Sequence, residues 1–162
     1  MITKTMNTKR IGRAGIALAL LSSIIGCVAL KPDKPAVDIS EFSNVTTVEA
    51  VKKLETNLKH SKANELAVFA PKHFSTADKA LVEARSLISK NEPREQVVQK
   101  VAVASAVLKN GDLVMRKVKE VLEEQLAIKD KLDSLETKKV YRSEYGSLEE
   151  RLNNIIREIE NG

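Results

Sequence analysis

The segment REQVVQKVAVASAVLKNGDLVMRKVKEVL, residues 94–122, decides the fold. Apolar or small residues recur in it at alternating steps of four and three. They are Val97, Val101, Ala104, Leu108, Gly111, Met115, Val118 and Leu122. This spacing places them on one side of a helix that packs against neighbouring helices. Because the pattern passes through Gly111 without a change of phase, we expect one continuous helix, with a break at Gly111 as the alternative.

Two helical patterns precede this segment. Residues 72–90 place apolar residues at the same steps of three and four. They are Phe74, Ala77, Leu81, Ala84 and Ile88, and we expect Leu81 to be buried between neighbouring helices. Thr46 and Glu49 have the spacing of a capping box, which predicts a helix over about 47–69. Pro71 suits the first turn of the next helix.

The rest of the chain is also helical in pattern. The central helix is expected to extend over about 93–138, and a last helix follows over about 144–160. Alternating strand patterns are absent, and the composition is rich in helix-forming residues. We therefore predict an all-α fold over residues 46–162. It consists of extended antiparallel helical hairpins, or a three- to four-helix coiled-coil-like bundle, with one long central helix.

An internal similarity links the two ends of this region. A shift of 71 positions aligns residues 74–91 with residues 145–162, and Leu81 then falls on Leu152. Heptad helices match each other easily, so the alignment leaves both a duplication and a chance match open. If there is a duplication, we expect the chain to stop where a third helix of the second unit would begin.

The N-terminus has the pattern of a secretory signal peptide. Residues 1–15 carry four basic residues and no acidic one. The apolar run IALALLSSII, residues 16–25, is too short to span a bilayer, which takes about 20 residues. We therefore predict a cleaved signal peptide over residues 1–26.

The end of this segment resembles the lipobox of bacterial lipoproteins. The matching residues are Ile24, Ile25, Gly26 and Cys27, the only cysteine. The resemblance implies cleavage between Gly26 and Cys27 and a lipid on the Cys27 thiol, with a structural thiol after a plain signal peptide as the alternative. Val28 in place of aspartate favours the inner leaflet of the outer membrane, facing the periplasm.

Residues 27–45 are expected to form the lipidated end and an extended tether, because KPDKPAVD, residues 31–38, holds two prolines and no glycine. Four of the 27 basic residues and none of the 22 acidic ones lie before Cys27, so the mature chain has a net charge of +1. This charge offers no electrostatic footprint for nucleic acid.

Catalytic and metal-binding patterns are lacking in the sequence. His60 and His73 stand on different segments and are expected to be surface residues. Phosphate-loop, nucleophile-elbow and zinc-protease motifs are absent. We therefore predict no enzyme activity, no metal and no cofactor beyond the covalent lipid on Cys27.

The stretch from Ala67 to Ala84 combines Ala-Pro, an aromatic residue and alanine–leucine heptads. The residues that carry this pattern are Ala70, Pro71, Phe74, Ala77, Leu81 and Ala84. The pattern resembles a helical envelope family, the domain of unknown function 4398, which often precedes an OmpA-like domain in bacterial lipoproteins. Because no OmpA-like region follows Gly162, peptidoglycan binding is not part of the expectation.

These features favour a structural or adaptor lipoprotein that binds another envelope protein or itself, with no small-molecule substrate. The alternatives are an exclusion or immunity lipoprotein of a mobile element and, less favoured, a small-ligand carrier. Two helices cover each other's apolar sides poorly, so we expect the C-terminal hairpin to bind the partner. The expected residues are Ile128, Leu132, Leu135, Ile155 and Ile159.

Overall fold

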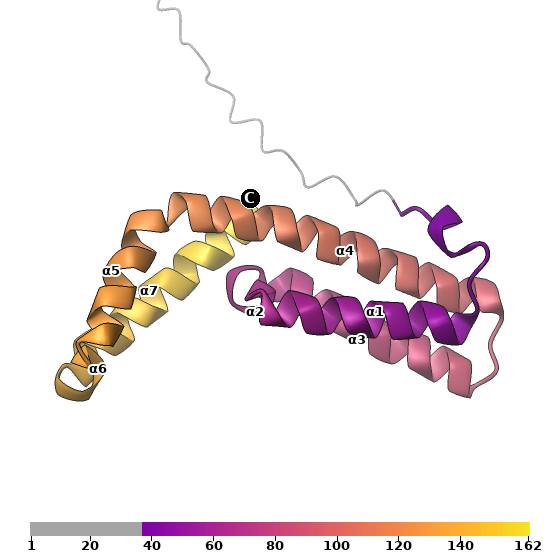
Figure 1. Ribbon diagram of the computed structural model, residues 1–162, viewed down its shortest axis with the longest axis horizontal. Helices are drawn as coiled ribbons and strands as arrows, with labels where there is room; N and C mark the ends of the chain where they lie inside the picture. Colours follow the sequence, from indigo (N-terminus) through magenta and orange to yellow (C-terminus); the bar gives the residue numbers. More distant parts are fainter. Residues whose placement is uncertain (1–36) are drawn as a thin grey trace, which may run out of the picture.

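The computed structural model describes residues 37–162, and all regular secondary structure in this range is helical (Figure 1). The predictions for the signal peptide, the lipobox, Cys27 and residues 27–36 of the tether lie outside the described residues. An extended tether that continues to residue 45 is wrong, because residues 40–42 form a 3₁₀ helix and the apolar Phe42 side chain is buried in the core. The elements in the described range are the 3₁₀ helix η1 (Ser40–Phe42) and the α-helices α1 (Thr47–Ala63), α2 (Leu66–Phe69), α3 (Pro71–Ser89), α4 (Arg94–Val121), α5 (Glu123–Ser134), α6 (Thr137–Val140) and α7 (Arg142–Asn161). The all-α prediction is confirmed.

Helix α1 begins as predicted and ends earlier. The Thr46 side chain accepts a hydrogen bond from the Glu49 backbone N–H at 3.3 Å, and the Glu49 carboxylate accepts one from the Thr46 N–H at 3.0 Å. The capping box is therefore confirmed. A single helix over 47–69 is wrong, because Glu65 takes a left-handed conformation (φ 68°) that turns the chain into the short α2. Pro71 lies in the first turn of α3, where no N–H is required.

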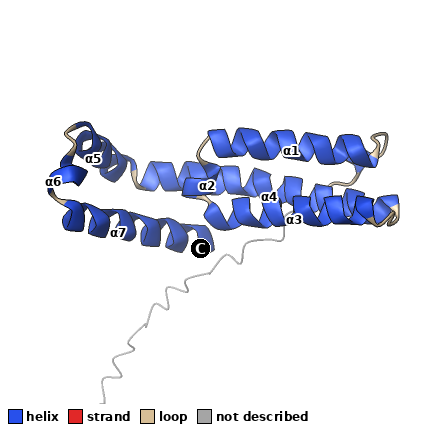
Figure 2. Cartoon of the chain, turned by 90° about the horizontal axis from the view of Figure 1, so that it is seen from below, coloured by secondary structure: helices blue, strands red, loops and turns tan. Residues whose placement is uncertain are grey.

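Helices α1 and α3 and the first half of α4 form a three-helix bundle (Figures 1 and 2). Leu81 on α3 is 6% exposed and lies in one apolar cluster with residues of α1 and α4, as predicted. Phe74 and Ile88 pack against this cluster from the same side of α3. The largest fully buried side chains of this cluster, which we call the first core, are Phe42, Leu54, Leu66, Val97, Val98 and Val101.

Helix α4 runs through Gly111 without a break, which confirms the continuous helix predicted there. Gly111 is buried at the point where α4 lies against α2 and the start of α3. A Cβ atom added to Gly111 would lie 2.9 Å from the His73 Cβ and 3.3 Å from the Leu66 Cδ1. The glycine permits this close approach, at a helix-propensity cost of about 1 kcal/mol relative to alanine.

The long helix predicted over 93–138 is wrong beyond Val121. Leu122 adopts φ −104° and ψ 14° between α4 and α5. The Leu122 N–H still donates to the Val118 carbonyl (2.9 Å), and the Leu126 N–H donates to the Leu122 carbonyl (2.8 Å). The chain therefore bends without unwinding (Figure 1). The bend lets the buried Leu122 pack against α7.

Helix α7 returns beside α5, and its C-terminal end reaches the start of α3 (Figure 2). Its bounds confirm the helix predicted over 144–160. A second apolar cluster joins α2, the end of α4 and α7. This second core consists of Phe69, Val118, Leu122, Leu152 and Ile156. It is smaller than the first core, so the hairpin of α5, α6 and α7 depends on fewer buried side chains.

The two parts share one backbone pattern at an offset of 71 residues. The ends of α1 and α5 are separated by this offset, as are the left-handed residues Glu65 and Glu136 and the starts of α3 and α7. Five backbone hydrogen bonds of the turn recur at the same offset. Their donors are Asn64, Glu65, Val68, Ala70 and Phe74 in the first part and Leu135, Glu136, Lys139, Tyr141 and Tyr145 in the second. The similarity in sequence is therefore a structural repeat.

Candidate functional site

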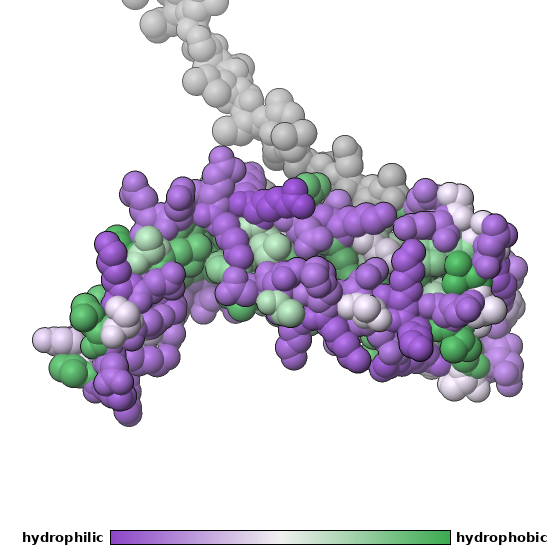
Figure 3. All heavy atoms as spheres, viewed as in Figure 1, coloured by the Kyte–Doolittle hydropathy of each residue, from purple (hydrophilic) through white to green (hydrophobic). Residues whose placement is uncertain are grey.

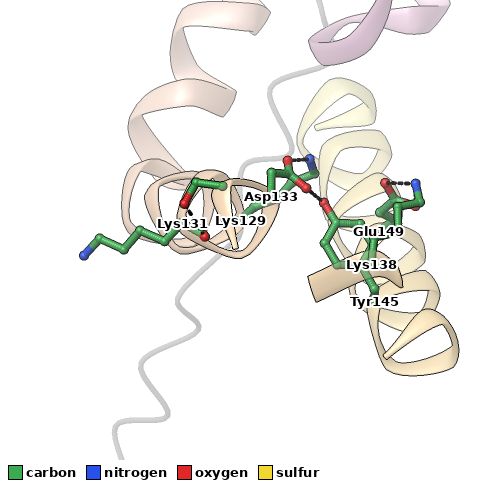
Figure 4. Close-up of polar contacts among 7 residues, drawn as sticks. Lys129, Lys131, Asp133, Lys138, Tyr145 and Glu149 are labelled. Carbon is green, nitrogen blue, oxygen red and sulfur yellow. Dashed lines mark hydrogen bonds and ion pairs between the residues drawn. The ribbon is translucent and has the colours of Figure 1, made fainter. Parts of the chain in front are cut away.

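A polar network joins the helices of the α5–α7 hairpin (Figure 4). Tyr145 on α7 donates its hydroxyl hydrogen to the Asp133 carboxylate on α5, and the Lys129 Nζ lies 2.7 Å from the other oxygen of that carboxylate. On α6, the Lys138 Nζ lies 3.2 Å from the Glu149 carboxylate of α7 and 5.1 Å from the centre of the Tyr145 ring. Tyr145 is only 3% exposed, so it links the three helices from inside the hairpin.

The network shifts the titration of its members. Hydrogen bonds from Lys129 and from Tyr145 hold the pKa of Asp133 below its usual value. The hydrogen bond to Asp133 is the main reason that the pKa of Tyr145 lies above its usual value. The same carboxylate raises the pKa of Lys129. All three pKa values are shifted further from neutral pH, and such groups suit a structural link better than acid–base catalysis, which works best with a pKa near the working pH.

Aliphatic side chains of the hairpin lie in solvent. Among the five predicted partner-binding residues, three are exposed: Ile128 (56%), Leu135 (74%) and Ile155 (37%). Leu132 is half-buried. Ile159 packs against the second core and does not share the open surface. Figure 3 shows apolar residues at the end of the molecule formed by α5 and α6. Binding of a partner at these residues stays a prediction.

Three further exposed residues extend this surface and were missed by the sequence analysis. They are Val121 (54%), Val140 (74%) and Tyr141 (57%). The aligned sequence segments do not include these positions, so no signal in the sequence identified them. The structural repeat matches them to Ala50, Phe69 and Ala70, all of which are buried. The second part thus exposes apolar residues at positions that the first part covers.

An open groove of about 420 Å³ lies between α2, α5 and α7. Its apolar side chains come from both the bundle and the hairpin, and charged residues such as Glu65 and Lys129 lie among them. A small-ligand carrier is expected to enclose its ligand in a deep, mostly apolar cavity. This groove does not provide such an enclosure.

The two histidines contact different partners. At the surface, the His60 ring nitrogen lies 2.9 Å from the side-chain nitrogen of Asn64. His73 was expected at the surface but is half-buried, because its Nδ1 lies 2.8 Å from the Glu160 carboxylate at the end of α7. The backbone N–H groups of Lys72 and His73 donate to the same carboxylate at 3.1 and 2.9 Å. Glu160, which is 8% exposed, therefore supplies an N-terminal cap that α3 does not have in its own sequence.

Within residues 37–162, histidine, cysteine and carboxylate side chains form no cluster of three or more that could hold a metal ion. The helices of this range are too short or too polar to cross a membrane. The chain matches no protein-family model, no curated protein and no solved structure. The resemblances to the lipobox and to the envelope family therefore stay predictions, and the hairpin surface carries the functional argument.

Proposed function

We propose that the protein is a structural or adaptor lipoprotein of the cell envelope. A lipid on Cys27 holds it at the inner leaflet of the outer membrane, and the helical part faces the periplasm and binds an envelope protein. The anchor is supported by the basic N-terminal segment, the ten-residue apolar run and the Gly26–Cys27 junction. Two or more acyl chains would give stable anchoring, since each buried methylene contributes about 0.8 kcal/mol.

The contrast in exposure between the bundle and the hairpin carries the adaptor role. The bundle also exposes single apolar residues, so the contrast lies between equivalent positions: Val121, Val140 and Tyr141 are 54%, 74% and 57% exposed, whereas their counterparts Ala50, Phe69 and Ala70 are 0%, 7% and 0% exposed. Burying apolar surface stabilises by about 25 cal/mol per Å². Exposed apolar side chains gathered at one end of a molecule are typical of partner sites.

The shape of the molecule supports an anchored adaptor. The first described residues lie beside the start of α4, and α6 lies at the opposite end of the molecule (Figure 1). Helix α4 has 28 residues, which corresponds to about 42 Å at 1.5 Å per residue. A lipid at the N-terminus would therefore leave the hairpin distant from the membrane surface and accessible to a partner.

Labelling with palmitate tests the anchor. The wild-type chain should incorporate the label and have a mature N-terminus at Cys27, and Cys27→Ser should abolish incorporation because the acceptor thiol is lost. Label in the variant at the wild-type level, or a mature N-terminus at another residue, contradicts the proposal.

Co-purification from membranes tests the adaptor role. The double variant Ile128→Glu/Ile155→Glu places carboxylates on the hairpin surface. The matched control Val82→Glu/Leu113→Glu alters residues of α3 and α4 that lie outside the hairpin and are 59% and 61% exposed. Associated proteins are identified with the full, anchored chain. We expect the hairpin variant to lose a protein that the control retains; the same associated proteins for both variants would contradict the adaptor role.

A further inference from the structure

We infer that the hairpin binds a single helix of the partner, which lies on α5 and α7 as α4 lies on α1 and α3. The buried side of this helix carries small residues, alanine or serine, at heptad spacing. This inference rests on the proposed adaptor function and specifies the chemistry of the partner. It follows from the structural repeat, because the first part shows which sides of the repeated helices a third helix covers.

In the first part, α4 covers one side of α1 and one side of α3. Asn57 and Ser61 of α1 line a groove with Leu108 of α4, and Ala80 of α3 lines another with Val103 of α4. Small residues on these same sides are completely buried. They are Ala50, Ala77 and Ala84, each 0% exposed. These positions define the side of the repeat that receives a third helix.

The equivalent positions of the hairpin, 71 residues later, are open. Ala84 is 0% exposed, and its counterpart Ile155 is 37% exposed. Ala50 is also 0% exposed, and its counterpart Val121 is 54% exposed. The other apolar counterparts are Ile128, which is 56% exposed, the half-buried Leu132, and Leu148, which is half-buried because it also packs against the second core. The counterpart of Ala80 is the exposed Arg151. Among the described residues, no element covers this side of the hairpin as α4 covers the bundle.

The opposite side of the hairpin is already occupied. Leu126 and Ile156 lie in or against the second core, together with Phe69 of α2. Their counterparts in the first part, Glu55 and Arg85, form an ion pair at the surface with an N···O distance of 2.5 Å. The hairpin therefore attaches to the bundle through the side that is polar in the first part. The side equivalent to the α4 contact stays available for one helix.

The size of the exposed side chains specifies the partner helix. In the first part, buried alanines of α3 and valines of α4 share the first core, and Ala80 of α3 lies in one groove with Val103 of α4. The hairpin carries larger residues, Leu148 and Ile155, at the alanine positions. Helices pack at 8–10 Å between axes when the side chains fill the contact, so the partner must present small residues here. A second copy of the hairpin would place equally large residues opposite Leu148 and Ile155, which argues against self-association.

The chain can supply a test helix in the register of the repeat. A copy of residues 92–112, which holds the first half of α4, is attached after Gly162 of the full chain and thereby continues the offset of 71 residues. In the alanine version, the added copy carries Val97→Ala, Val101→Ala and Leu108→Ala. In the matched control, aspartate replaces the same three residues of the added copy.

Thiol labelling reports whether the added helix covers the hairpin. Each extended chain carries Cys27→Ser and one new cysteine, either Ile155→Cys on the hairpin or Val82→Cys on the bundle. With the alanine extension, labelling of Ile155→Cys should slow about ten-fold, because closed states protect buried groups. Labelling of Val82→Cys should not change, and circular dichroism should show the added helix. The aspartate extension should slow neither cysteine.

Equal labelling of Ile155→Cys with both extensions overturns the inference, as does an alanine extension that stays unfolded while Ile155→Cys stays reactive. The inference is also overturned if the chain without an extension forms dimers in sedimentation and its Ile155→Cys is labelled more slowly as the dimers form. A second copy would then occupy the surface. All samples carry Cys27→Ser, so these outcomes are independent of the anchor. Failure of the anchor is detected separately by palmitate labelling.

Discussion

The bundle and the hairpin are built on the same backbone turn, but within residues 37–162 a third helix covers the inner side of the bundle alone. Ala84 is completely buried beneath α4, whereas its counterpart Ile155 is 37% exposed. The turns share five backbone hydrogen bonds at the offset of 71 residues. A repeated backbone therefore does not fix which side of a hairpin is buried. The neighbouring elements and the size of the side chains decide it.

The interiors of the two hairpins also differ in chemistry. Leu58 and Phe74 belong to or pack against the first core, and Lys129 and Tyr145 occupy the equivalent positions in the second part. Burying a leucine or phenylalanine side chain contributes about 1.5–3 kcal/mol, whereas a typical hydrogen bond contributes about 1 kcal/mol net. We therefore expect the hairpin to be the less stable part.

Truncating equivalent leucines should produce the largest effects. Leu81 and Leu152 are related by the offset, and each is 6% exposed. Leu81→Ala should lower the free energy of unfolding by about 2–5 kcal/mol and weaken the whole bundle, because it leaves a cavity in the first core. Leu152→Ala should cost about 2 kcal/mol and open mainly α7. Urea denaturation followed by circular dichroism measures both; equal losses would show that the two parts unfold as one unit.

The two helical glycines should respond to alanine with opposite signs. Gly111→Ala should destabilise by about 1–3 kcal/mol, because the new Cβ would meet the His73 Cβ at 2.9 Å. Gly146→Ala should stabilise by about 0.5–1 kcal/mol, because its new Cβ would have no neighbour within 4 Å in the hairpin. Thermal unfolding midpoints give the signs. A gain for Gly111→Ala would refute the close contact of α4 with α3.

These glycines also show how far the sequence predicts the fold. The uninterrupted heptad pattern through Gly111 correctly predicts a continuous helix, and the spacing of Thr46 and Glu49 correctly predicts the start of α1. Such local patterns depend on residues a few positions apart. The bend at Leu122 was not predicted, because it depends on the packing of α7, which lies far along the chain.

The turn after α1 shows a second limit. Glu65 and Glu136 adopt left-handed conformations that usually favour glycine or asparagine, so the residue type gave no signal for either turn. The candidate surface was predicted in part, because amphipathic spacing identifies apolar residues but not which neighbour covers them. Ile159 therefore was expected on the open surface and instead packs on the second core.

Removing the Glu160 cap, which joins the end of α7 to the start of α3, should have an intermediate effect on stability. Glu160→Ala deletes the carboxylate that accepts hydrogen bonds from two N–H groups at the start of α3. The loss of this cap should cost about 1–2 kcal/mol. Glu158→Ala, at an exposed position of the same helix, should change stability by less than about 0.5 kcal/mol. Equal unfolding midpoints for the two variants would show that the cap does not stabilise the fold.

The change in the stability of the hairpin with pH should be the smallest of these effects. The lowered pKa of Asp133 means that its contribution is present above its unfolded pKa of about 4 and is lost as the pH falls through the folded pKa. The raised pKa of Tyr145 means that its contribution is present below about pH 10 and is lost as the pH rises through the folded pKa. Tyr145→Phe should reduce the alkaline loss in denaturation curves recorded between pH 8 and 12, and the rest of the loss should remain because Lys129, whose pKa is also raised, loses its contribution there too. An unchanged alkaline loss would assign it to groups other than Tyr145.

Hydrogen exchange of the full chain, read by mass spectrometry, tests most directly the claim that a closed bundle carries an open hairpin. Amides exchange through local openings, whose free energies are low where few side chains are buried. We expect α5, α6 and α7 to exchange at least about ten-fold faster than α1, α3 and the first half of α4. Equal protection of the two parts would contradict the account, because the hairpin would then be as closed as the bundle.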